Sequence, residues 1–199
     1  MHALRELLGT TGWVERTSAF ASTLRRSSTR VGGLLLVGTP TEEPWHLAAH
    51  LDDESRFAGV PELSPTLVRW SPPPQAPPHL SVTLARLEAA RRDETVFVVA
   101  PDAAPEQLLE RVADARRIGA TILSIDDGDD ELGSLVHDRL IVPSDDDALV
   151  VARSMPTSVD MELVQHLVSV AAGESTTRVG VRDRLARFLE RVSGPAPRR

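Results

Sequence analysis

The stretch TVFVVAPDAAPEQLLE, residues 95–110, carries a strand, a turn and the start of a helix in one short segment. The run from Thr95 to Ala100 is apolar or β-branched throughout, which predicts a strand buried on both faces. Pro101 ends the run, and a helical pattern begins after a short polar elbow. In parallel α/β proteins such an elbow, at the carboxyl end of a strand, is where ligands bind.

The same alternation extends in both directions from this stretch. Besides residues 95–100, we expect strands at 31–38, 66–70, 120–125 and 139–143. A helix is expected at 107–118, with Gly119 as its stop. Apolar strands that alternate with amphipathic helices favour a parallel sheet covered on both faces. The predicted fold class is therefore α/β, a three-layer sandwich with a five-stranded, parallel, flavodoxin-like sheet.

Three local features sharpen this expectation. Thr41 to Pro44 place a capping hydroxyl, two acids and a proline where the first turn of a helix favours them. The proline-rich segment 71–79 is expected to run extended, followed by a helix from Ser81. The acids of residues 144–147 resemble another helix start.

The chain divides into four predicted parts: an N-terminal helical segment (1–30), an α/β core (31–143), C-terminal helices (144–193) and a disordered tail (194–199). Two apolar helical stripes exceed what a five-stranded core needs, which favours a homodimer. The stripes are Trp13, Phe20 and Leu24, and Val181, Phe188 and Leu189. A row of arginines near the C-terminus is interpreted as a solvated face, with an acidic partner or RNA as the alternative: Arg178, Arg182, Arg184, Arg187 and Arg191.

Composition narrows the function classes. The 199 residues are 41% hydrophobic, carry a net charge of −7 and contain no cysteine. A negative chain with 4% aromatic residues is a poor match for nucleic acid. The apolar runs are too short to span a bilayer, and the N-terminus has no secretion signal, so we expect no membrane association and a cytoplasmic location.

Residues 31–143 resemble the sugar isomerase (SIS) domain, which binds phosphosugars. The segments LLERVADARRIGATILSI, LGSLVHD and RLIVP are similar to the second half of that domain. The resemblance implies a phosphate site in the loops after the first and third strands, and a homodimer paired through helices. It places ligand-binding residues at Gly38, Thr39, Thr41, Asp102 and Glu106.

Those two loops depart from the family pattern. Family members use Ser- and Gly-rich loops there, whereas this chain has GTPTEEPW and APDAAPEQ. Carboxylates repel a phosphate, and Pro101 and Pro105 have no N–H to donate. The resemblance therefore supports the fold and counts against the family's usual ligand.

Catalytic and metal candidates are few. In sugar isomerases a His or Glu often serves as acid and base, which points to Glu42, Glu43 and His46. The acidic run at 126–131 is interpreted as a turn rather than a divalent-metal loop. His46 and His50 have a spacing compatible with zinc but lack companion ligands, so neither a metal nor a cofactor is predicted.

The leading hypothesis is a non-catalytic SIS-like binding or regulatory module that has lost the phosphosugar loop. One alternative is an aldose–ketose phosphosugar isomerase with an atypical site around Glu42, Glu43 and His46. A second alternative is a docking scaffold that uses the acidic carboxyl edge or the proline-rich loop at 71–78.

Overall fold

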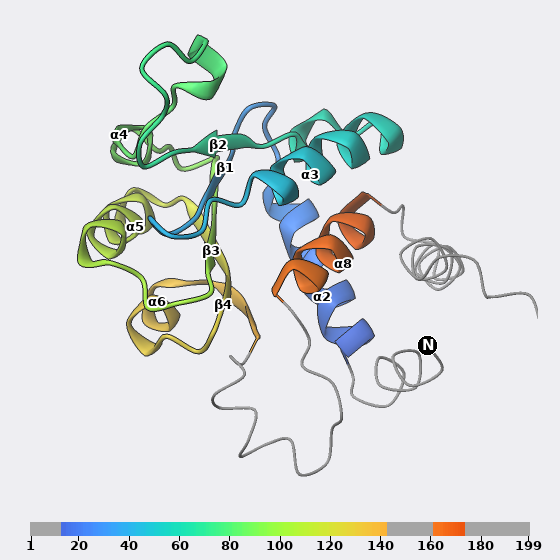
Figure 1. Cartoon of the computed structure of the whole chain (residues 1–199). Helices are drawn as coiled ribbons and strands as arrows, with labels where there is room; N and C mark the ends of the chain where they lie inside the picture. The colour runs from blue at the N-terminus through green and yellow to red at the C-terminus, as the bar shows by residue number, and fades with distance from the viewer. Residues whose placement is uncertain (1–12, 143–160, 174–199) are drawn as a thin grey trace, which may run out of the picture.

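The computed structural model describes residues 13–142 and 161–173, and within them five parallel strands form one sheet in the order β2-β1-β3-β4-β5 (Figure 1). The strands are β1 (Leu34–Val37), β2 (Thr66–Val68), β3 (Thr95–Ala100), β4 (Thr121–Asp126) and β5 (Asp138–Ile141). The long strands β3 and β4 pair in register from Thr95 opposite Thr121 to Ala100 opposite Asp126. The predicted flavodoxin-like α/β sheet is confirmed.

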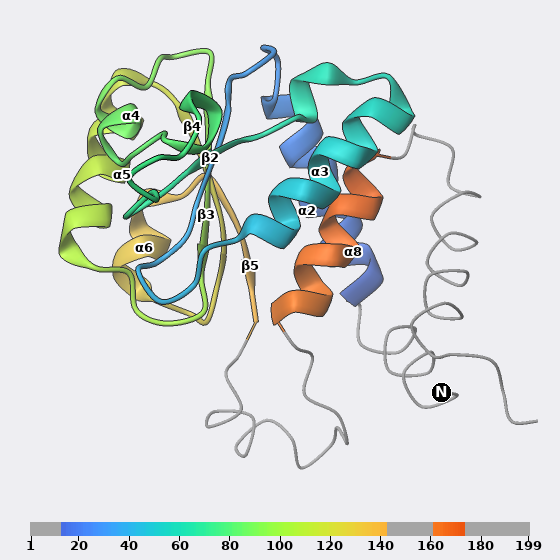
Figure 2. The same cartoon turned by 45° about the horizontal axis from the view of Figure 1, so that its top comes forward.

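Helices cover both faces of the sheet (Figures 1 and 2). On one face lie α2 (Trp13–Ser27), α3 (Trp45–Ala58) and α8 (Met161–Gly173); on the other lie α4 (Ala85–Glu88), α5 (Glu106–Ile118) and α6 (Asp130–Leu135). Strand side chains alternate between two cores: Phe97 packs with Phe20 and Leu24, whereas Val98 packs with Leu108 and Val112. This alternation makes the three layers.

The predicted element boundaries agree closely in the centre of the sheet. β3 spans the predicted residues, and α5 begins one residue earlier than predicted and ends before Gly119, whose φ of 104° is left-handed. β1 is shorter than predicted, because residues 31–33 form a turn with Gly32 at a φ of 71°.

Two local predictions were wrong. Thr41 does not cap a helix: α3 begins at Trp45 after Pro44, because Thr39 and Thr41 bond to each other and to the loop instead. The proline-rich segment does not simply run extended, and only the short 3-10 turn η2 (Pro78–Leu80) and α4 follow it. Ser81 Oγ donates to the carbonyls of Ala76 and Pro77, at 2.8 and 3.0 Å, so the end of the proline-rich segment turns back on itself where the sequence predicted the start of a helix.

The N-terminal stripe does not lie on the surface of the molecule. Trp13, Phe20 and Leu24 are buried in the core that α2 shares with the sheet and with α8, so this part of the argument for a dimer was wrong. The second stripe, the C-terminal arginines, the acids at 144–147 and the tail at 194–199 lie outside the described residues. Within the described residues, no helix is both long and apolar enough to cross a membrane.

The amino edge of the sheet is fastened by a buried carboxylate. Glu94, directly before β3, is 2% exposed and receives Arg91 N at 3.0 Å. It pairs with Arg86 at 2.6 Å and with Arg30 at 3.6 Å. These contacts join the turn after α2, helix α4 and the start of the central strand.

Candidate functional site

The loops that follow the strands meet at the carboxyl edge of the sheet, the usual ligand position in a parallel α/β fold. The residues predicted to bind a ligand or to act in catalysis come from two of them, residues 38–44 after β1 and 101–105 after β3, and from the helix starts beyond. A contact joins the two loops: Thr41 Oγ1 donates to Asp102 Oδ2 at 3.4 Å.

The first loop folds back on itself. A Cβ on Gly38 would lie 1.9 Å from the carbonyl oxygen of Glu42 and 2.6 Å from Pro44 Cδ, so only glycine fits beneath this turn. The Thr39 and Thr41 hydroxyls are 3.0 Å apart, and Glu42 N donates to Thr39 Oγ1 at 3.2 Å. The hydroxyls and this amide therefore satisfy one another.

Two residues that directly follow β2 also contact the first loop. Trp70 Nε1 donates to Gly38 O at 2.8 Å, and Arg69 Nε lies 2.7 Å from Glu43 Oε1. Of the three catalytic candidates, Glu43 is thus in an ion pair. Glu42 is exposed, and the exposed His46 ring lies against Trp45 with centroids 3.3 Å apart.

The loop after β3 is occupied in a similar way. Ala104 N donates to Asp129 Oδ2 at 2.8 Å, and the prolines at 101 and 105 have no N–H. Asp102 and Glu106 are both exposed, and Glu106 opens α5. The N–H of Ala104, the buried residue of this loop, therefore already has a carboxylate partner.

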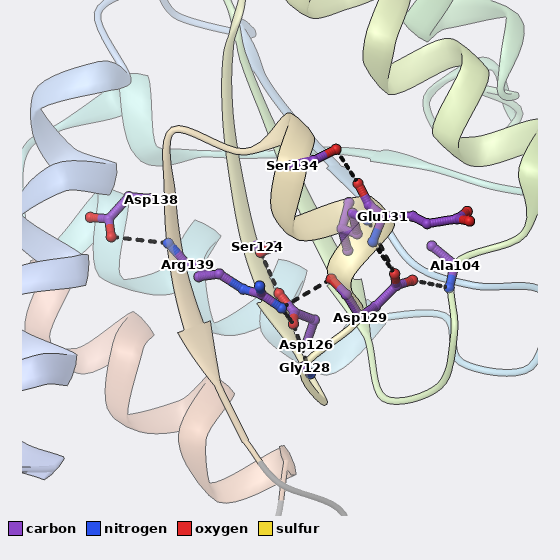
Figure 3. Close-up of polar contacts among 10 residues, drawn as sticks. Ala104, Ser124, Asp126, Gly128, Asp129, Glu131, Ser134, Asp138 and Arg139 are labelled. Carbon is purple, nitrogen blue, oxygen red and sulfur yellow. Dashed lines mark hydrogen bonds and ion pairs between the residues drawn. The ribbon is translucent and has the colours of Figure 1, made fainter.

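A buried carboxylate stands at the end of β4 (Figure 3). Asp126 is fully buried and accepts from Ser124 Oγ at 2.5 Å and from Gly128 N at 2.9 Å. Arg139 Nη2 of β5 donates to its Oδ1 and to Asp129 O. A Cβ on Gly133 would lie 2.1 Å from Arg139 Nη1, so a glycine makes room for this guanidinium.

The acidic run at 126–131 contains the predicted turn, between Asp126 at the end of β4 and Asp130 at the start of α6, and its cap on that helix was not predicted. Asp129 Oδ1 accepts from Glu131 N at 2.8 Å and from Leu132 N at 3.1 Å, which caps α6 (Figure 3). Its other oxygen holds Ala104 N. Asp129 therefore links the β4 loop to the β3 loop.

Together these contacts run the whole length of the edge, and we call them the edge ties. They pass from the β2 exit to the first loop, then through Asp102, Asp129 and Asp126 to β5. Sequence reasoning missed Arg69, Trp70 and Arg139, and it took Asp126 and Asp129 only as turn residues. The available signal was an acid that closes an apolar strand, followed by an arginine in the next strand.

The edge is electrostatically negative around Asp127. Burial raises the pKa of the Asp127 carboxyl, and the nearby carboxylates of Asp126, Asp129 and Asp102 raise it further, against a lowering hydrogen bond from its own backbone. An anion that approached here would meet the same repulsion.

No cluster of three or more His, Asp or Glu side chains with the arrangement of a metal site occurs in the described part of the chain. The two histidines with zinc-like spacing have different neighbours. His46 lies against Trp45, and His50 contacts the ring of His166.

Comparison with known proteins gives a structural likeness and no sequence match. No family model matches the chain, and no curated protein does. A putative phosphosugar isomerase from Silicibacter pomeroyi superposes with a TM-score of 0.54 at 13% identity, covering 94% of this chain and 51% of its own. The chain thus spans about half the length of that protein.

Two further structures match over more of their own length. The sugar isomerase domain of an RpiR transcription factor from Sphaerobacter thermophilus has a TM-score of 0.53 at 13% identity, with 96% of each chain covered. The NanR protein of Vibrio vulnificus, solved with ManNAc-6P, has a TM-score of 0.55 at 11% identity and covers 96% of this chain and 67% of its own. At such identities the likeness establishes architecture, and the chain has the sugar isomerase (SIS) fold that its sequence predicted.

Proposed function

We propose that this chain is a non-catalytic binding or regulatory module of the SIS fold whose carboxyl edge has lost the site for a sugar phosphate. The observation that carries the proposal is the set of edge ties, in which the chain's own side chains use the groups that an anion would need.

The donors are the first support. A phosphate in such a position is held by free backbone N–H groups and small hydroxyls. Here Glu42 N, Ala104 N and Gly128 N donate to side chains of the protein itself. A phosphate would have to break these bonds before it could form its own.

Charge is the second support. Asp102, Glu106 and Asp127 carry carboxylates on the loops and helix starts of this edge. One carboxylate about 4 Å from a phosphate charge costs about 1 kcal/mol even in water, and more near a protein surface. Arg69 and Arg139, the arginines within the edge ties, are already paired with Glu43 and Asp126.

One structural neighbour supports the regulatory part of this proposal. The sugar isomerase domain of a transcription factor is matched over 96% of its own length and of this chain. By contrast, this chain covers 51% of the putative phosphosugar isomerase.

Calorimetry with hexose and pentose phosphates, alongside the same sugars without phosphate, tests the proposal. We expect no phosphate-dependent binding at concentrations up to about 1 mM. The matched variant Glu106→Gln with Asp127→Asn removes two charges and leaves the edge ties in place. Binding gained by this variant would assign the block to charge, and continued absence of binding would assign it to the edge ties.

Tight phosphosugar binding by the wild-type chain would overturn the proposal and favour the alternative isomerase. Glu42 and His46, exposed beside the first loop, are then the groups to test as acid and base, because Glu43 is paired with Arg69. Conversion of an aldose phosphate to its ketose, lost in Glu42→Gln or His46→Gln, would identify that enzyme.

A docking scaffold is the third possibility, and the exposed acids at this edge favour a basic partner. The proline-rich segment is the other candidate surface, and deletion of residues 71–78 in a pull-down tests it. The homodimer also stays a prediction, now supported only by the stripe Val181, Phe188 and Leu189 and by the family resemblance. Light scattering that shows a monomer at micromolar concentration would contradict it.

A further inference from the structure

The seam between α3 and α8 holds the last described helix on the domain. α8 packs against α2 and α3, and the three helices lie side by side in both views (Figures 1 and 2). At its C-terminal end, Arg25 Nη1 of α2 donates to Ala172 O at 3.1 Å. Gly173 lies so close to α3 that a Cβ there would be 2.2 Å from Glu54 Oε2.

Two histidine rings meet in this seam. His50 of α3 and His166 of α8 are in edge-to-face contact, with centroids 4.4 Å apart and planes at 89°. Burial lowers the pKa of His166 from 6.5 to about 4, and charge repulsion from His50 contributes to the same shift. Glu162 lies one turn earlier on α8, and the two helices packed against α8 carry these ionisable groups: His46, His50, Asp52, Asp53, Glu54 and Arg56 on α3, and Glu15, Arg16, Arg25 and Arg26 on α2.

We propose that the seam is an acid-sensitive contact, in which uptake of a proton by His166 weakens the packing of α8 on α3. A charged imidazolium there is half-buried beside a second histidine, so the packed form resists the proton and the separated form accepts it. α3 begins directly after the first loop of the carboxyl edge, so the seam lies on the helix that follows that loop.

The sign of the effect follows from proton linkage. The folded form has the lower pKa, about 4 against 6.5, so between those values the unfolded form binds more protons. Stability from this group is complete above pH 6.5 and falls as the pH drops toward 4.

Urea unfolding at about pH 7 and about pH 5 tests the proposal in the full chain. The folding equilibrium constant of the wild type should fall more than that of His166→Gln, by up to about 20-fold from a pKa of about 4 against 6.5, and by less to the extent that solvent screens the half-buried ring. The matched control His46→Gln, an exposed histidine on the same helix, should behave like the wild type. Equal pH dependence in the wild type and in His166→Gln would overturn the proposal.

A second measurement covers the case in which His166→Gln does not fold. NMR titration of the six histidines of the wild type should show one imidazole that protonates near pH 4, together with amide shifts in α3 and α8 that follow the same curve. If all six protonate above about pH 5.5, or if the seam amides do not follow, the proposal fails.

Discussion

A buried carboxylate paired with arginine stands at each edge of the sheet. Glu94 lies directly before β3 at the amino edge, and Asp126 ends β4 at the carboxyl edge. Both are at most 2% exposed, and each also accepts a backbone N–H. The chemistry of the two groups is therefore nearly the same.

The two carboxylates differ in the edge of the sheet at which they lie, and therefore in the role each could have. Glu94 joins α4 and the turn after α2 to the central strand, at the edge opposite to the one where parallel sheets bind ligands. Asp126 joins two strands and the start of α6 at the edge where such sheets bind ligands. A carboxylate that fastens the fold at one edge thus lies, at the other, within the candidate site and bonds to the chain's own groups.

Loss of the Asp126 carboxylate should have the largest effect. Asp126→Ala leaves Arg139, Ser124 and Gly128 without their buried acceptor, and we expect it to destabilise the chain by about 3 kcal/mol. Urea unfolding followed by tryptophan fluorescence measures this. Asp114→Ala, which breaks an exposed pair with Arg117, should cost within about 0.5 kcal/mol. A cost for Asp126→Ala as small as this control would mean that the edge ties do not hold the loops.

Glu94→Ala should follow, at about 2 kcal/mol, because its arginines can turn to water once the carboxylate is gone. Arg86 is 27% exposed and Arg30 is 39% exposed, so neither is left fully desolvated. The same unfolding assay applies. If the order of the two variants were reversed, the amino edge would be the more tightly fastened of the two.

Asp127→Asn should have the smallest effect and the opposite sign. Its pKa is raised, so its charge is unfavourable in the folded chain above that pKa, and removal of the charge should stabilise the protein at neutral pH by up to about 0.5 kcal/mol. The gain should disappear at about pH 3, where the wild-type carboxyl is neutral in both states. A loss of stability at neutral pH would show that Asp127 makes favourable contacts as an anion.

Much of the architecture could be predicted from residue pattern because strands such as Leu34–Val37 and Thr95–Ala100 are buried on both faces. A short, continuous apolar run is typical of a strand in a parallel sheet that has helices on both faces. Gly119 marked the end of α5 in the same direct way, through a backbone conformation that glycine favours.

The contacts of the candidate site join residues that are distant in the sequence, so a local pattern could not predict them. Thr41 has the spacing of a helix cap, but its partner Asp102 lies 61 positions further along the chain. The pairing of Arg139 with Asp126 depends on Gly133, because a side chain there would collide with the Arg139 guanidinium. The stripe on α2 was visible in the sequence, but an apolar stripe does not reveal whether its partner is the same chain or a second one.

The edge ties also affect how quickly any ligand could enter. Because each loop holds its neighbour, opening one position means breaking contacts on both sides of it, and the open form is correspondingly rare. A ligand that selects this form binds with an apparent affinity reduced by the open fraction, and its association is limited by the rate of opening. Slow association that becomes independent of ligand concentration would then be the kinetic mark of this edge.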